Sequence, residues 1–154
     1  MSKFKIVALG GTFDIIHKGH LTLLQKGFSI SFKVIIGLTS DELAMKKGKK
    51  LLHIYSQRLE SLKSTINKNF PNSDYEISKL DNDFGPAVLN GEVEALVVSE
   101  ETIDKGEILN KLRSQKHLSP VLVVSVPMVL AEDGKRLSTT RIKNSEIDIE
   151  GNLR

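Results

Sequence analysis

The chain has 154 residues, of which 40% are hydrophobic and 27% are charged, with a formal net charge of +3 and no cysteine. This length fits one domain over residues 1–154 with its own core, and the lack of cysteine excludes a disulfide framework, a thiolate zinc site and a cysteine nucleophile. No apolar segment is long enough to span a membrane, so we expect a cytoplasmic protein with no membrane partner.

Apolar segments alternate with segments of helical periodicity along the chain. Buried strands are predicted at residues 4–9, 33–38, 95–99 and 121–126, and an edge strand at residues 75–80. Helices are predicted from Gly19 onward, over residues 56–70 and around residues 103–112. This alternation predicts an α/β fold, a Rossmann-like three-layer sandwich with a five-stranded parallel sheet. In such a sheet, ligands bind beyond the carboxyl ends of the strands, so function is sought there.

A glycine pair and two histidines follow the first predicted strand. Gly10 and Gly11 allow backbone amides to approach a ligand closely, and the helix that begins near residue 18 directs free amides toward an anion. His17 and His20 lie three residues apart and therefore share one helical face. The segment predicts a phosphate clamp.

Other interpretations of these residues are weaker. A single histidine is more often a satisfied structural residue, but here two of them converge on a helix start. A metal site would need further ligands, and neither His53 nor His117 lies in a ligand-like pattern. The Gly-x-Gly-x-x-Gly pattern of dinucleotide-binding loops is absent.

Residues 11–14, Gly-Thr-Phe-Asp, followed by residues 17–20, His-Lys-Gly-His, resemble the signature of the HxGH nucleotidyltransferase superfamily. Residues 137–143, Leu-Ser-Thr-Thr-Arg-Ile-Lys, resemble its second motif, Ile-Ser-Ser-Thr-x-x-Arg. The superfamily pattern ends in arginine where this chain has Lys143, and lysine lacks the bidentate fork of arginine. Arg141 cannot substitute for it, because residues two apart on a helix face different ways.

The intervening chain resembles the archaeal and eukaryotic form of phosphopantetheine adenylyltransferase. The similar segments are residues 37–43, the lysine cluster 46–50, residues 83–86, residues 97–102 and the closing residues 143–151. The resemblance implies transfer of the adenylyl group of ATP to 4′-phosphopantetheine, giving dephospho-coenzyme A and pyrophosphate. It also implies Mg²⁺ bound with ATP, whereas no protein metal ligand is expected.

The resemblance assigns roles to particular residues. His20 is expected to contact the α-phosphate, His17 to hold the nucleotide phosphates and Thr12 to bind the reacting groups, with Gly10, Gly11 and Phe13 completing this loop. Ser138, Thr139 and Thr140 would bind the β- and γ-phosphates, together with Lys143 if it replaces the arginine. Lys46 is the first candidate for a lysine that reaches the acceptor phosphate or the α-phosphate, with Lys47 close behind. Glu100 is a candidate for the nucleotide pocket, and Arg113 would either reach a phosphate or lie on an exposed helix face.

Three alternatives remain open. The chain could be a sister enzyme with another acceptor, either a flavin mononucleotide adenylyltransferase or a glycerol-3-phosphate cytidylyltransferase. A non-catalytic nucleotide sensor with the same fold is less favoured, because both histidines are intact. A nucleic-acid partner is not expected, because the lysines outside the cluster 46–50 are scattered and only two tyrosines and no tryptophan are available for stacking. The sequence sets no oligomeric state, and a monomer is compatible with it.

Overall fold

The computed structural model of the chain describes residues 3–88 and 90–127. In this part, five parallel strands form one sheet in the order β3-β2-β1-β4-β5. The strands are β1 (Phe4–Gly11), β2 (Ser31–Thr39), β3 (Tyr75–Leu80), β4 (Val93–Ser99) and β5 (Leu122–Val126). The predicted parallel sheet is confirmed, and the segment expected at an edge is the edge strand β3.

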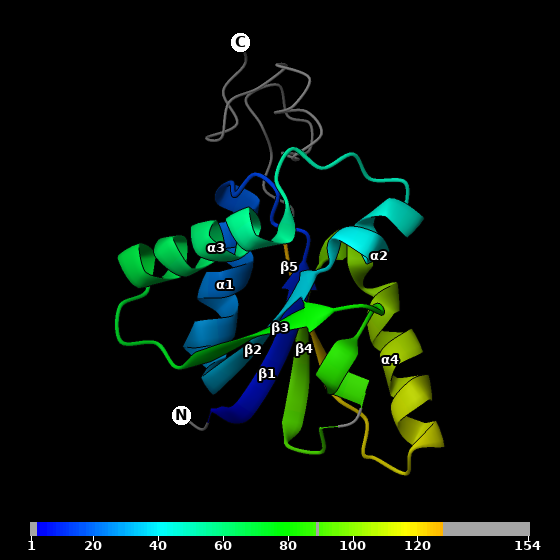
Figure 1. Cartoon of the computed structure of the whole chain (residues 1–154). Helices are drawn as coiled ribbons and strands as arrows, with labels where there is room; N and C mark the ends of the chain where they lie inside the picture. Colours follow the sequence, from blue (N-terminus) through cyan, green and yellow to red (C-terminus); the bar gives the residue numbers. More distant parts are fainter. Residues whose placement is uncertain (1–2, 89, 128–154) are drawn as a thin grey trace.

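Helices cover both faces of this sheet (Figure 1). They are α1 (Lys18–Ile30), α2 (Asp41–Lys46), α3 (Tyr55–Asn69) and α4 (Asp104–Gln115), with short 3₁₀ turns η1 (Gly85–Val88) and η2 (Glu100–Thr102). Helices α1 and α3 pack on one face, whereas α4 and η1 pack on the other. The resulting three layers confirm the Rossmann-like α/β class. No helix among the described residues is both long and apolar enough to cross a bilayer.

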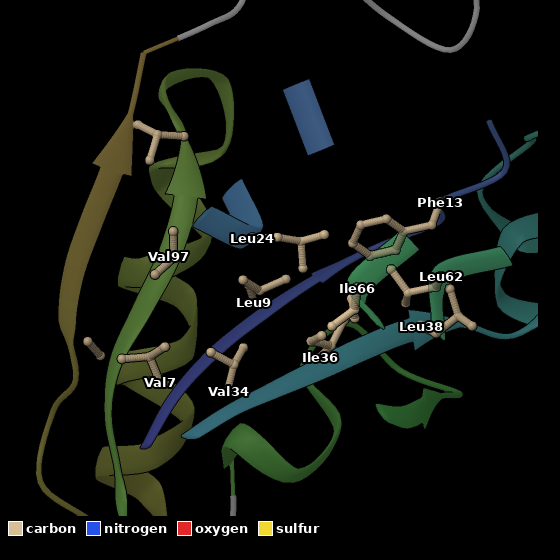
Figure 2. Close-up of a cluster of buried hydrophobic side chains, with 12 residues drawn as sticks. Val7, Leu9, Phe13, Leu24, Val34, Ile36, Leu38, Leu62, Ile66 and Val97 are labelled. Carbon is tan, nitrogen blue, oxygen red and sulfur yellow. The ribbon is translucent and has the colours of Figure 1, made fainter. Parts of the chain in front are cut away.

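The strands contribute side chains to two separate buried clusters, because alternate residues of a strand point to opposite faces of the sheet. Val7 and Leu9 of β1 join the cluster under α1 and α3, where Leu24 and Leu62 are fully buried (Figure 2). Ile6 and Ala8, together with their neighbours from β2 and β4, face α4 instead. Because both faces are covered, the central strands read as continuous apolar runs rather than as an alternating pattern.

Helix α2 was not among the predicted elements. Ser40 caps it, since its Oγ accepts a hydrogen bond from the backbone N–H of Leu43 at 3.0 Å, and Asp41 and Glu42 occupy the first turn. A serine followed by two acidic residues is a typical helix start, so the signal was present in the sequence. Six residues are too few for a recognisable apolar period, which is why periodicity missed the helix.

Arg113 of α4 is buried, and backbone carbonyl groups occupy its guanidinium. Its side chain is only 1% exposed, and its guanidinium donates hydrogen bonds to the backbone carbonyls of Ser119, Ala87, Asn90 and Val93. Both expectations for Arg113 were therefore wrong. The guanidinium instead ties together the chain segments around α4, and its hydrogen bonds to Ala87 and Val93 satisfy two buried carbonyl groups.

Candidate active site

The candidate site lies where β1 ends. Gly10 and Gly11 pair in register with Gly37 and Leu38 of β2, and β1 also pairs with β4 on its other side. The chain runs from β1 to β2 and β3 on one side and then crosses over to β4 on the other side. The carboxyl end of β1 is thus the point where strand order reverses, the usual ligand site of an open parallel sheet.

His17 and His20 are locked together at the start of α1. The Nδ1 atom of His17 accepts a hydrogen bond from the backbone N–H of Gly19 at 3.1 Å, and the Nδ1 atom of His20 accepts from the backbone N–H of His17 at 3.1 Å. The two rings stack with their centroids 4.0 Å apart. Because Nδ1 is the acceptor in both, a neutral imidazole carries its proton on Nε2. Each ring therefore presents an Nε2–H donor, the group that a phosphate oxygen requires.

Two neighbouring residues explain why this geometry tolerates little change. A Cβ atom added at Gly19 would lie 2.9 Å from Cε1 of His17, so any side chain there would displace the His17 ring. Phe13 has a φ of +50°, a conformation that costs energy for an aromatic residue. Its buried ring lies with its centroid 4.9 Å from that of His20. The strained backbone of Phe13 thus places an apolar wall against His20.

His20 is a neutral donor in the free protein. Burial of the ring is the main reason that its pKa falls from 6.5 to about 3, and the nearby His17 and Lys49 lower it further. An imidazole with this pKa is uncharged at neutral pH. Its contribution at an α-phosphate would therefore be a directed Nε2–H donor in a site largely shielded from water, rather than a full positive charge.

The lowered pKa of His20 predicts acid sensitivity of the fold. Between pH 6.5 and about 3 the unfolded chain binds a proton at His20 that the folded protein does not, so stability rises with pH in this window. The stability is complete above pH 6.5 and is lost as the pH falls below that value, by up to about 1.4 kcal/mol per pH unit. We expect a lower urea midpoint at about pH 5 than at about pH 7, and a smaller difference in His20→Ala. An equal pH dependence in both proteins would contradict a buried neutral His20.

The lysine that reaches the clamp is Lys49. Its Nζ atom donates a hydrogen bond to Oγ1 of Thr12 at 2.9 Å. Lys46, the first candidate from the sequence, ends α2 with an exposed side chain, and Lys47 forms an ion pair with Asp83. Thr12 and Lys49 therefore join His17 and His20 at the end of β1. Lys49, rather than Lys46, is the candidate for the lysine that reaches the acceptor phosphate or the α-phosphate.

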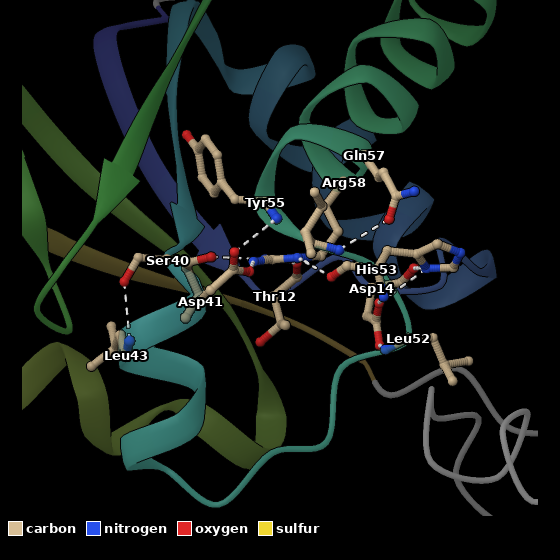
Figure 3. A network of polar contacts seen from close by, with 12 residues as sticks. Thr12, Asp14, Ser40, Asp41, Leu43, Leu52, His53, Tyr55, Gln57 and Arg58 are labelled. Carbon is tan, nitrogen blue, oxygen red and sulfur yellow. Dashed lines mark hydrogen bonds and ion pairs between the residues drawn. The ribbon is translucent and has the colours of Figure 1, made fainter.

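A polar network around Asp14 and Arg58 lies beside the clamp loop, and the sequence does not predict it (Figure 3). The carboxylate of Asp14 accepts hydrogen bonds from the backbone N–H groups of Leu52 and His53, at 2.9 and 3.0 Å. Nδ1 of His53 also lies 3.1 Å from Oδ1 of Asp14. Arg58 lies fully buried beside them and contacts the backbone of Thr12. None of these pairings has a local sequence signal, because the partners are 38 to 46 residues apart.

The remaining candidates are Glu100 and the residues of the second motif. Glu100 lies exposed in η2, immediately after β4. Ser138, Thr139, Thr140 and Lys143 lie outside the described residues, as does the closing segment 143–151. The second motif therefore remains an expectation from the sequence.

A cavity of about 480 Å³ opens between α4 and the loop after β3. The residues that line it are mostly uncharged, with Asp83 and Lys116 as the exceptions: Asn82, Asp83, Phe84, Gly85, Ile108, Leu112 and Lys116. A second, much smaller cavity shares Asp83 and Phe84 and extends to Gly10 and Gly37 at the ends of β1 and β2. The hydrogen bond from Lys47 holds the pKa of Asp83 below its usual value, so this carboxylate is ionised. Together the two cavities extend from α4 to Gly10 at the end of β1.

Comparisons with known proteins agree with this geometry. A family model described as cytidylyltransferase-like matches residues 8–145. The phosphopantetheine adenylyltransferase of Methanothermobacter thermautotrophicus is 37% identical over 151 residues, which cover 98% of this chain and 90% of that protein. The phosphopantetheine adenylyltransferase of Methanosarcina barkeri is 40% identical over 151 residues, covering 96% and 92%.

A solved structure shares the fold. The crystal structure of a protein of unknown function from Archaeoglobus fulgidus superposes with a TM-score of 0.72 at 29% sequence identity. The match covers 80% of this chain and 89% of that one. This similarity supports the arrangement of the sheet and helices.

Proposed function

We propose, because this chain belongs to the phosphopantetheine adenylyltransferase family, that it transfers the adenylyl group of ATP to 4′-phosphopantetheine. The products are dephospho-coenzyme A and pyrophosphate, a step of coenzyme A synthesis. The observation that carries the proposal is the clamp at the end of β1. There, His17 and His20 each accept a backbone hydrogen bond at Nδ1, which leaves the proton on Nε2, and Lys49 contacts Thr12 in the same loop region.

The reaction needs alignment and charge stabilisation rather than a general base. The acceptor phosphate is largely dianionic at neutral pH and is itself the nucleophile. One of its oxygens forms a bond to the α-phosphorus of ATP, while the bond from that phosphorus to the bridging oxygen breaks and pyrophosphate leaves. We propose that His20 donates to an α-phosphate oxygen and that His17 holds the nucleotide phosphates. Lys49 and Thr12 would bind the incoming phosphate, and Ser138, Thr139 and Thr140 the β- and γ-phosphates.

Magnesium enters this proposal with the nucleotide. No group of three His, Cys, Asp or Glu side chains within residues 3–88 and 90–127 has the geometry to hold an ion. Mg²⁺ commonly binds through substrate phosphates with few protein ligands, which suits a site made of neutral and cationic donors. The ion would neutralise charge on the leaving pyrophosphate.

The acceptor's pantetheine arm suits the cavity beside α4. The arm is an uncharged chain with amide groups, and Phe84, Ile108 and Leu112 supply apolar walls near the polar side chain of Asn82. The smaller cavity leads from there toward Gly10. We therefore propose that the arm extends from the clamp toward α4, so that the phosphate lies at Thr12 and Lys49.

An acceptor panel tests the proposed reaction. The purified chain is incubated with ATP or CTP and with 4′-phosphopantetheine, flavin mononucleotide or glycerol 3-phosphate, and products are identified by mass spectrometry. We expect dephospho-coenzyme A to form from ATP and 4′-phosphopantetheine, and no product to form with CTP or with either other acceptor. Turnover should be lost when Mg²⁺ is chelated. Formation of a different adduct would show that the proposed acceptor is wrong. Nucleotide binding without turnover of any acceptor would indicate a non-catalytic sensor.

Four further expectations belong to the same proposal. Residues 1–154 are proposed to act as one domain, located in the cytoplasm, with no nucleic-acid or membrane partner. A monomer is proposed as the working oligomeric state. Cell fractionation and sedimentation analysis test location and oligomeric state.

A further inference from the structure

Arg58 is a buried cation on an otherwise apolar helix face. It shares the inner face of α3 with Leu62 and Ile66, and its side chain is completely buried. A buried charge is rarely the most stabilising choice at such a position, since an apolar residue of similar volume often does as well or better. This arginine therefore calls for an explanation in terms of the contacts that it makes.

The guanidinium of Arg58 joins three separate segments of the chain through four contacts (Figure 3). Nη1 donates to the carbonyl of Thr12 in the clamp loop at 2.9 Å and to that of Thr39 at the end of β2 at 2.7 Å. Nη2 donates to Oδ1 of Asp41 at the start of α2 at 2.7 Å. Nε donates to the carbonyl of His53, just before α3, at 3.2 Å.

Two of these segments carry the partners of the contact between Lys49 and Thr12. Thr12 supplies its carbonyl to Arg58 and its hydroxyl to Lys49. Lys49 lies on the loop of residues 47–54, which is held by Arg58 at His53 and by the Asp14 carboxylate at Leu52 and His53. A single guanidinium thus restrains both ends of the Lys49 contact.

We infer that Arg58 is a positioning residue, which holds Lys49 against Thr12 so that its ammonium meets the reacting phosphate. This inference rests on the proposed function, because it assigns Arg58 to the same site. An arginine is required because its planar fork directs several donors at once, whereas lysine offers a single ammonium on a flexible stem. Lysine at position 58 would keep the positive charge beside Asp41, but it could not donate hydrogen bonds to the carbonyls of Thr12 and His53 at the same time.

Arg113 provides a matched control. It is as buried as Arg58 and also donates to several backbone carbonyls, but its partners are Ser119, Ala87, Asn90 and Val93. None of these belongs to the clamp or to the 47–54 loop. Arg113→Lys should therefore disturb the fold in a similar way without moving Lys49.

The test is a double-mutant cycle with Lys49→Ala, read as kcat and KM for dephospho-coenzyme A formation. We expect Arg58→Lys to lower kcat by about 10- to 100-fold, because small misplacements of a reacting group cost this much. In the Lys49→Ala background the same change should cost only a few-fold, since the group that it positions is gone. Arg113→Lys should leave kcat within a few-fold in both backgrounds. The inference would be overturned if the fold losses of kcat in Arg58→Lys and Lys49→Ala multiplied in the double variant. It would also be overturned if Arg113→Lys lowered kcat as much as Arg58→Lys.

A readout without substrate separates this inference from the proposed function. Hydrogen exchange of the Leu52 and His53 amides, whose N–H groups bind Asp14, reports the order of the loop. Faster exchange in Arg58→Lys than in Arg113→Lys supports positioning even if the wild type forms no dephospho-coenzyme A, whereas equal rates refute it. If Arg58→Lys does not fold, Asp41→Asn takes its place in both measurements, with the same outcomes expected. It weakens the Nη2 contact and also the hydrogen bond that Asp41 accepts from the Tyr55 backbone N–H.

Discussion

Replacing His20 with alanine is expected to lower kcat by about 10²- to 10³-fold, which is the usual cost of losing one preorganised donor to a transition-state oxygen. The His20 ring is held by the His17 backbone N–H and by the Phe13 ring, so its Nε2–H is aimed before the substrate arrives. Because the pKa of His20 is about 3, the lost group is a neutral donor. The measurement is the steady-state rate of dephospho-coenzyme A formation at saturating ATP and 4′-phosphopantetheine.

Two variants sharpen this prediction. His20→Gln retains a neutral N–H donor on a side chain of similar length, so we expect it to recover part of the loss. His117→Asn is the matched control, because His117 is exposed and has a φ of +60°, a conformation that asparagine accepts readily. It should leave kcat unchanged. A His20→Ala enzyme within a few-fold of wild type would remove the main support for the clamp.

Replacing Lys49 with alanine is expected to lower kcat by about 10²-fold, whereas Lys46→Ala should stay within a few-fold of wild type. Lys49 reaches Thr12 at the end of β1, while the Lys46 side chain is exposed at the end of α2. The pair is well matched, because both substitutions remove one positive charge from the same cluster and alter the overall field equally. Product formation is measured for both, with KM for each substrate.

A Lys49→Arg variant adds a control on charge alone. It keeps the positive charge but changes its shape and reach, so we expect partial activity. If Lys46→Ala were the more damaging change, the contact between Lys49 and Thr12 would not represent the catalytic arrangement, and the role would return to Lys46.

The sequence indicated the fold and the clamp well because both depend on local order. Residues 4–9 are apolar and end at Gly10 and Gly11, so a buried strand with a ligand-binding loop after it was the direct prediction. His17 and His20 lie three residues apart at a helix start, and the structure stacks their rings there. The order of strands and helices along the chain already favoured a parallel sheet, because parallel neighbours need crossover connections.

Other features depended on contacts between distant segments. The lysine cluster 46–50 gave no local reason to prefer one member, and only the path of the loop after α2 brings Lys49 to Thr12, 37 residues away. Arg58 and Arg113 look like solvent-facing residues of polar helices in the sequence, yet both are buried. Their carbonyl acceptors lie 5 to 46 residues away, so no spacing rule connects them. Asp14 likewise finds its partners on the 47–54 loop.

The sequence by itself therefore determined the strands, the principal helices and the histidine pair, because hydrophobic periodicity and helix-start geometry act over a few residues. Only the tertiary structure decided which lysine meets the clamp and which arginines are buried. Those outcomes depend on hydrogen bonds that form once β2, α2 and α3 have packed around the end of β1. The histidine clamp is a local motif, whereas the residues that surround it are brought there by the tertiary structure.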